Sequence, residues 1–304
     1  MTQAAPDYRK YLDPKTLAKI EALELRARLA VEGYFTGMHR SPYQGFSVEF
    51  AEHRQYTPGD DLRHLDWKVY ARTDKRYIKQ YVAETNLICM LVVDSSESMS
   101  YRSRHAELTK LEYATAAAAA LAYLALHQHD SVGLAAFDER ITRFVKPRNH
   151  PGQWKTLIDE MEKSAGRAKT SIRAVLSDLA DRLQRRTLVV LISDLLDDAD
   201  GIVNGLKQLR YKRNDVIVLQ VLDPAELSFH FHGPTRFVGL EGTGKLSVDP
   251  ASVRKRYLEE VDRFVATLRG HCRQMHVDYE VFNTADSLEL VLSTYLANRC
   301  ARIR

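Results

Sequence analysis

From residue 87 to the end of the chain, short continuous apolar runs alternate with longer amphipathic stretches. Residues 87–93 read LICMLVV, and an uninterrupted run of this kind is typical of a strand buried on both faces. The predicted strands cover residues 87–93, 131–137, 141–145, 187–192, 215–221 and 277–282, and the predicted helices cover residues 105–128, 151–163, 171–184, 200–211, 251–274 and 285–299. This alternation predicts an α/β domain with a doubly wound, mostly parallel sheet.

The first quarter of the chain has a different pattern. Residues 14–34 show a mostly helical period, whereas residues 40–85 are polar and irregular until a strand-like stretch at 77–83. We therefore expect residues 1–76 to form a helical and irregular N-terminal extension that packs on the main domain. Residues 77–304 are expected to form the α/β domain itself.

Composition narrows the class of protein. The chain is 45% hydrophobic and 28% charged, with a net charge of +4, which is ordinary globular composition. Lys and Arg are interleaved with Asp and Glu, whereas nucleic-acid binding would favour a clustered basic stripe with aromatic residues. Cys89, Cys272 and Cys300 are odd in number and form no CxxC pair, so neither a zinc site nor a disulfide framework is indicated.

The expected location is the cytoplasm. The chain starts MTQAAPDYRKYLD, which has no apolar stretch behind a basic start and does not resemble a secretory signal. The longest nearly apolar run, residues 114–126, is short of the ~20 residues that a membrane span requires.

Polar side chains gather where two of the predicted strands end. Asp94, Ser96 and Ser98 follow strand 87–93, Asp194 follows strand 187–192, and Thr170 precedes a predicted helix. The carboxyl ends of parallel strands form the ligand-binding edge of such a sheet. These side chains offer only oxygen, which selects Mg²⁺, Mn²⁺ or Ca²⁺ over zinc or copper. Because hydroxyls are neutral ligands, a cation held there would keep affinity for a carboxylate from outside.

This pattern resembles the metal-ion-dependent adhesion site of the von Willebrand factor A family, whose motif is Asp-x-Ser-x-Ser, then Thr, then Asp. The loop after strand 87–93 matches the first part, Asp194 matches the last, and Thr170 is the middle ligand, with Ser171 as a substitute because the usual preceding glycines are missing. The resemblance implies that the serines and threonine bind the metal directly or nearly so, and that the carboxylates often act through water. Taken singly, each residue could instead be a turn or helix cap.

A second resemblance covers residues 40–296. The stretch YTPGDDLRHLDWK at 56–68, and the later LVVLISDLLD and VIVLQVLDPAE, are similar to the bacterial domain-of-unknown-function 58 family, a von Willebrand A variant commonly associated with MoxR-type AAA+ ATPases. The resemblance makes such an ATPase the expected partner. Within residues 56–72 we expect a charge network anchored by Trp67 that braces the extension, with a partner-binding patch as the alternative.

Two function classes follow. The first is a non-enzymatic, metal-dependent protein-binding module whose partner supplies an Asp or Glu to the metal, working as an adaptor with the ATPase. The second is a Mg²⁺-dependent phosphoryl-transfer enzyme that uses Asp94 as nucleophile. Such an enzyme usually has a second acid two residues on, where this chain has Ser96, and the sequence contains no GxSxG, P-loop or GxGxxG motif. The sequence therefore favours a binding module.

Two further groups of residues have the chemistry of metal ligands. Asp197, Asp198 and Asp200 could hold a second cation but are more typical of a helix N-terminus. His230 and His232 have the spacing of ligands, but neither a Cys nor a third His is near them in the sequence.

Overall fold

The computed structural model describes residues 48–57, 65–83, 87–164, 171–240 and 244–303. The chain divides into two compact units, residues 32–86 and residues 1–31 with 87–304, and each is described by itself. The predicted helix at 14–34 lies outside the described residues. No helix within the described ranges is long and apolar enough to cross a membrane.

The larger unit is built on one six-stranded sheet in the order β10-β7-β6-β3-β4-β5. Every neighbouring pair is parallel except β4 and the edge strand β5. The strands are β3 Ile88–Asp94, β4 Ser131–Phe137, β5 Ile141–Arg148, β6 Leu188–Ser193, β7 Asp215–Leu222 and β10 Asp278–Asn283. This is the predicted α/β class with a mostly parallel sheet.

The order of the strands reverses at β3. From β3 the chain adds β4 and β5 on one side, then returns to place β6, β7 and β10 on the other. The carboxyl ends of β3 and β6 therefore flank the topological switch point, which is where open α/β sheets bind ligands.

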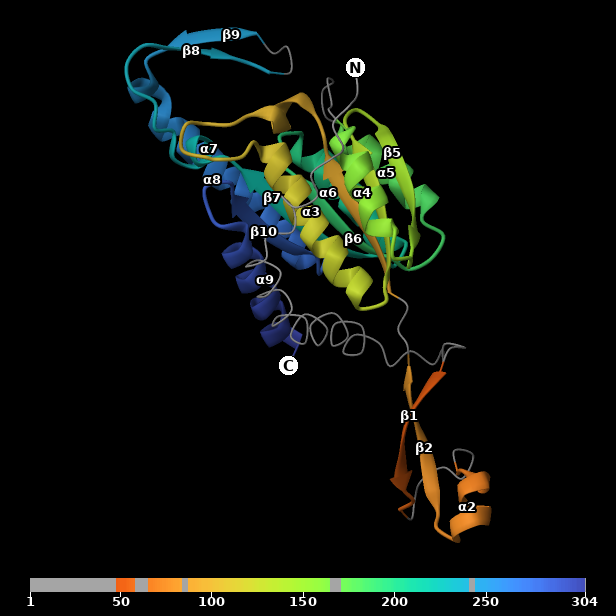
Figure 1. Cartoon of the computed structure of the whole chain (residues 1–304). Helices are drawn as coiled ribbons and strands as arrows, with labels where there is room; N and C mark the ends of the chain where they lie inside the picture. The colour runs from red at the N-terminus through yellow and green to blue at the C-terminus, as the bar shows by residue number, and fades with distance from the viewer. Residues whose placement is uncertain (1–47, 58–64, 84–86, 165–170, 241–243, 304) are drawn as a thin grey trace. The chain divides into compact units, whose positions relative to one another are not determined.

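Helices cover both faces of the sheet (Figure 1). α3, α4 and α9 belong to one layer and α5, α6 and α8 to the other. The helices are α3 Lys110–His127, α4 Gln153–Glu162, α5 Ile172–Arg182, α6 Ala199–Tyr211, α7 Pro224–Ser228, α8 Pro250–Gln274 and α9 Leu288–Ile303. The helix predicted from residue 105 begins only at Lys110, because Thr109 and Glu112 form a capping box there.

The core follows from the apolar runs. Met90, Val92, Val189 and Leu191 point into one buried cluster together with α5, α6 and α8. On the opposite face α3 presents alanines, so that its backbone approaches the sheet closely; Ala114, Ala117, Ala118, Ala119 and Ala122 are fully buried. A short antiparallel hairpin, β8 Thr235–Val238 with β9 Lys245–Val248, lies between α7 and α8 in the chain.

The smaller unit corrects two expectations. Strand β2, Tyr77–Ala83, was expected to open the α/β domain, but it pairs antiparallel with β1, Val48–Gln55, in a separate sheet. Trp67 was expected to be an apolar anchor, yet it is 63% exposed at the start of α2, Trp67–Thr73. Leu65 and Asp66 are buried there, at 7% and 6% exposure, and the packing of residues 1–76 on the main domain stays a prediction.

Candidate metal centre

Two adjacent strands bring the predicted carboxylates together. Asp94 is the last residue of β3, and Asp194 directly follows β6. The strands are parallel and in register, with Val93 opposite Ile192. Both carboxylates are fully buried, at 0% exposure. The sequence therefore placed both side chains correctly at one edge of the sheet.

The loop after β3 is held by the first carboxylate. Asp94 Oδ2 accepts a hydrogen bond of 2.6 Å from the Ser193 hydroxyl, and Asp94 Oδ1 accepts one of 2.9 Å from the Ser96 amide. The Ser95 hydroxyl donates to the Phe137 carbonyl oxygen at 2.8 Å and so takes no part in the cluster. The chain then enters a 3-10 turn, η3 Glu97–Ser100.

The alternate serines of the motif lie side by side. The hydroxyl oxygens of Ser96 and Ser98 are 3.0 Å apart, and both residues are buried. Alternation in this tight loop therefore brings the two hydroxyls together beside a carboxylate, as the spacing predicted. Among the described residues, no three His, Cys, Asp or Glu side chains gather as metal ligands, so any cation here would depend on the hydroxyl donors.

Burial of the two carboxylates has an electrostatic consequence. Desolvation by burial, followed by the neighbouring Asp194 carboxylate, raises the pKa of Asp94 to about 7, although hydrogen bonds from Ser193 and Ser96 act in the opposite direction. The cluster thus carries negative charge that its own hydrogen bonds do not fully offset. A divalent cation held by oxygen ligands fits this donor set.

The third segment of the motif is described only in part. Thr170 lies outside the described residues, and its substitute Ser171 precedes α5 without making a side-chain cap. Instead Asp197 Oδ2 accepts a 2.9 Å hydrogen bond from the Ile172 amide, and Asp198 caps α6 through Gly201. The acidic run therefore serves helix N-termini, the second of its two predicted roles.

The cluster also contains a buried lysine, Lys110, which the sequence did not predict. Lys110 Nζ lies 2.7 Å from Asp194 Oδ2 and 2.8 Å from Glu226 Oε1, and the lysine is 0% exposed. Burial alone would lower the pKa of this ammonium, but Asp194 and Glu226 raise it above its ordinary value. Lys110 therefore stays charged and occupies the Asp194 oxygen that faces it.

The backbone after Asp194 is strained. Leu195 has φ of 57°, a left-handed conformation that is uncommon for a leucine, and its side chain is 1% exposed. The Leu195 amide donates to Ser193 Oγ at 2.9 Å, and the Leu196 amide donates to Asp194 Oδ1 at 3.2 Å. Strain of this kind persists where surrounding contacts hold it, and it gathers at functional sites.

A third loop at the same edge is tied to the second. Asp223 ends the β7 segment, forms a capping box with Glu226 at the start of α7, and accepts a 2.9 Å hydrogen bond from the Ser103 amide. The loop between η3 and α3 is thus fastened to the loop after β7.

An apolar groove opens beside Ser98 and Lys110. Its volume is about 400 Å³. The remaining walls are mainly apolar and come from the loop after β6, from α7 and the segment that follows it, from β8 and the turn after it, and from α8; Tyr101 and the carboxylate of Glu226 also line the groove. Aromatic rings form its centre: Phe229 lies 4.4 Å from Tyr257 and 5.6 Å from Phe237, measured between ring centroids.

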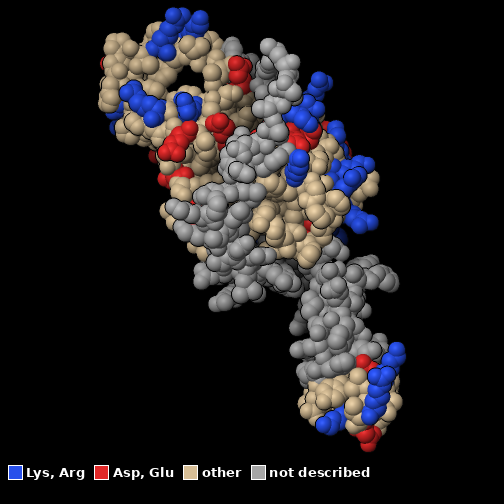
Figure 2. Space-filling model, viewed as in Figure 1, with Lys and Arg blue, Asp and Glu red and all other residues tan. Residues whose placement is uncertain are grey.

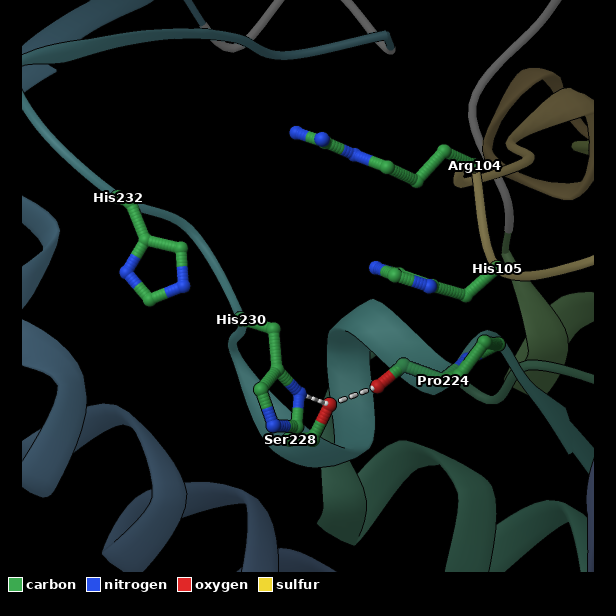
Figure 3. A pocket seen from close by; sticks show the side chains of 6 residues that line it. All are labelled: Arg104, His105, Pro224, Ser228, His230 and His232. Atoms are coloured by element: carbon green, nitrogen blue, oxygen red, sulfur yellow. Dashed lines mark hydrogen bonds between the residues drawn. The ribbon is translucent and has the colours of Figure 1, made fainter.

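A second hollow, of about 540 Å³, lies on the other side of segment 228–232. Figure 3 shows Arg104 and His105 reaching into it from one wall, with His230 and His232 on the facing wall. Arg254 fixes that wall, because its guanidinium donates to the Phe229 and Phe231 carbonyl oxygens at 3.1 and 2.9 Å. Among the residues that the structure describes, its lining includes one arginine and three histidines and no acidic side chain.

Similar solved structures include an aerotolerance-related membrane protein from Bacteroides fragilis, 17% identical, with a TM-score of 0.48, covering 71% of this chain and 99% of that one. BatB from Bacteroides thetaiotaomicron is 15% identical, with a TM-score of 0.45 and the same two coverages. The VWA domain of SpRpn10 is 10% identical, with a TM-score of 0.38, covering 72% of this chain and 95% of that one.

Relatives with higher sequence identity identify the family. Uncharacterized proteins of Mycobacterium bovis and Mycobacterium tuberculosis are each 31% identical to this chain over 246 residues, which is 79% of this chain and 76% of each relative. Residues 52–266 match the family described as "Protein of unknown function DUF58". The chain therefore belongs to the DUF58 family.

Proposed function

We propose that this protein is a non-enzymatic binding module that holds one divalent cation, Mg²⁺ or alternatively Mn²⁺ or Ca²⁺, at the β3–β6 edge and uses it to bind a protein partner. The partner supplies an Asp or Glu to the cation. The resemblance to proteins associated with MoxR-type AAA+ ATPases makes such an ATPase the proposed partner, with this chain as its adaptor.

One observation carries the proposal: two buried carboxylates and two adjacent hydroxyls gather at the switch point of the sheet. Asp94, Ser96 and Ser98 would hold the cation, together with Thr170. Asp194 would act from the outer shell, because Lys110 already occupies one of its oxygens.

The donor set accounts for the external ligand. Lys110 offsets only part of the charge of Asp94, Asp194 and Glu226, so the cluster favours a cation. The hydroxyl ligands are neutral, and a hard cation such as Mg²⁺ keeps exchangeable water positions. A bound cation would therefore supply an electrophilic centre to which a carboxylate can bind.

A single metal–carboxylate bond does not make a stable complex, because association itself costs several kcal/mol. Surface around the loops after β3, β6 and β7 must add contact area. Lys, Arg, Asp and Glu side chains are intermixed over the face of the larger unit in Figure 2, which suits a protein partner better than a polyanion.

The test has two parts. Calorimetric titration of the purified protein with MgCl₂ should give binding that Asp94→Ala abolishes, with the fold retained by circular dichroism. Capture of the MoxR-type ATPase from native cells should occur with Mg²⁺ and be lost with EDTA or in Asp94→Ala. Unchanged Mg²⁺ affinity in the variant, or capture that ignores both treatments, would refute the proposal.

The buried lysine favours one alternative. Enzymes that transfer a phosphoryl group through an aspartate usually have a lysine near the nucleophile, and Lys110 lies in the same cluster as Asp94, bonded to Asp194. It bonds Asp194 and not Asp94, and Ser96 stands where the second acid would be. Turnover of p-nitrophenyl phosphate with Mg²⁺ that disappears in Asp94→Ala would establish the enzyme; absence of turnover leaves the binding module.

A further inference from the structure

The apolar groove beside Ser98 carries exposed hydrophobic side chains. Leu196 is 52% exposed, Val238 55% and Leu240 41%, and all three line the groove. They come from two separated parts of the chain: Leu196 from the loop after β6, and Val238 and Leu240 from the end of β8 and the turn that follows it. Hydrophobic surface gathered from distant segments into one concavity marks a binding site more often than single exposed residues do.

The interior of the groove is ordered and aromatic. Phe231 packs edge-on against Phe237 with centroids 5.1 Å apart, and Phe229 and Tyr257 form its floor. Phe229 is itself only 7% exposed and takes a left-handed conformation, with φ of 49°, that ends α7. The rings are therefore held in place before anything binds, which reduces the ordering cost of binding.

The groove and the proposed metal centre share residues. Ser98 lines the groove and also pairs with Ser96, while Lys110 lines it and bonds Asp194. One end of the concavity is thus polar, with Glu226 bonded to Lys110 there as well, and adjoins the cation ligands, while the rest is mainly apolar. A single ligand that filled it would need a carboxylate at one end and a bulky hydrophobic group at the other.

We propose that the groove binds a segment of the partner protein in which an Asp or Glu is followed or preceded, within a few residues, by a large apolar or aromatic side chain. The carboxylate coordinates the cation, and the apolar side chain packs among the aromatic side chains of Phe229, Phe231, Phe237 and Tyr257. This inference rests on the proposed metal-dependent function and adds the sequence class of its partner.

The experiment is selection from a displayed library of random peptides on the immobilised full chain in MgCl₂, with elution at low pH, so that peptides whose binding does not depend on the metal are recovered as well. The expected peptides carry an acidic residue with Phe, Trp, Leu or Ile nearby. A synthetic peptide of the selected sequence is then titrated against variants. Leu240→Ser should weaken its binding about tenfold, which corresponds to about 1.4 kcal/mol, and Val238→Ser should act in the same direction.

The matched control is Leu246→Ser. Leu246 lies in β9 of the same hairpin and is 61% exposed, but it does not line the groove. This variant should bind the peptide as the parent does. Thermal unfolding of all three serine variants checks that the hairpin change leaves the fold intact.

The outcomes separate the two proposals. Acidic peptides without an apolar preference, or binding lost in Asp94→Ala but unchanged in Leu240→Ser and Val238→Ser, would overturn the groove inference and leave the metal-dependent module standing. Apolar peptides bound equally with EDTA and in Asp94→Ala would overturn both. Concentration-dependent dimerisation that Leu240→Ser abolishes would identify a second copy as the occupant and overturn the inference.

Discussion

At the scale of single residues, Lys110 has the largest structural role that the sequence did not indicate. A lysine in the first turn of a helix is usually solvated, and its partners Asp194 and Glu226 lie 84 and 116 positions away. No local pattern reveals such a pairing. Asp94, Ser96 and Ser98 could be predicted because spacing within one loop after a strand fixes their relative positions.

Replacing Lys110 by Met should leave the buried Asp194 carboxylate without its cation. Loss of one partner of a buried ion pair typically costs about 3–5 kcal/mol, so the free energy of unfolding should fall by about that amount in urea titration. Lys207→Met, at an exposed position of α6, should change it by about 0.5 kcal/mol or less. Combining Lys110→Met with Asp194→Asn should cost less than the sum of the single changes; simple additivity would show that the pair is not coupled.

Asp94→Asn tests the buried charge itself. The amide keeps the shape of the side chain and removes a charge that burial disfavours. In EDTA the melting temperature of this variant should equal or exceed that of the parent. Added MgCl₂ should raise the parent's melting temperature, since a ligand that binds only the folded state at about 100 times its Kd stabilises by about 2.7 kcal/mol. The variant should show no such rise; an equal rise in both would place the cation elsewhere.

At the scale of elements, periodicity predicted most helices and strands within a few residues, because each buries one continuous face. It missed α7, which is too short to have a period and owes its existence to Asp223, Pro224 and Glu226. It also assigned β2 to the large parallel sheet, whereas β2 pairs with β1, because the sequence of a strand does not indicate which strand it pairs with. The bounds of α3 depended on a capping box and not on apolar spacing.

Two helical glycines make a matched prediction. A Cβ on Gly205 of α6 would lie 2.9 Å from Leu176 Cβ and Cδ1 of α5, whereas a Cβ on Gly270 of α8 would meet nothing within 4 Å. Gly205→Ala should therefore destabilise by about 1–3 kcal/mol through overpacking. Gly270→Ala should stabilise by about 0.5–1 kcal/mol through helix propensity. Denaturant midpoints measure both, and a stabilising Gly205→Ala would show that the two helices can separate at little cost.

At the scale of the whole molecule, the switch point could be predicted once a parallel sheet was expected, because strand ends on either side of it must meet. The groove and the basic hollow could not, since their walls come from loops and a hairpin whose placement depends on tertiary contacts such as Arg254 with Phe229 and Phe231.

Cation binding should slow amide exchange locally. Hydrogen exchange with and without MgCl₂ is expected to show added protection at residues 94–101 and 194–198, the two loops that meet at the switch point. Strand β10, which lies at one end of the sheet order and is separated from β6 by β7, should be unchanged. Protection spread evenly over the chain would indicate a general effect on stability and not a bound ion at this edge.

Segment 228–232 separates two cavities and lines both of them. Its phenylalanines, Phe229 and Phe231, face the groove, and Ser228, His230 and His232 face the basic hollow. A displacement of this segment toward the groove or toward the hollow would change the shape of both. If an anion bound in the hollow changes the affinity of the groove for its ligand, then that ligand must change the affinity of the hollow for the anion by the same factor. Ligands in the two cavities would then be thermodynamically coupled through a strip of five residues.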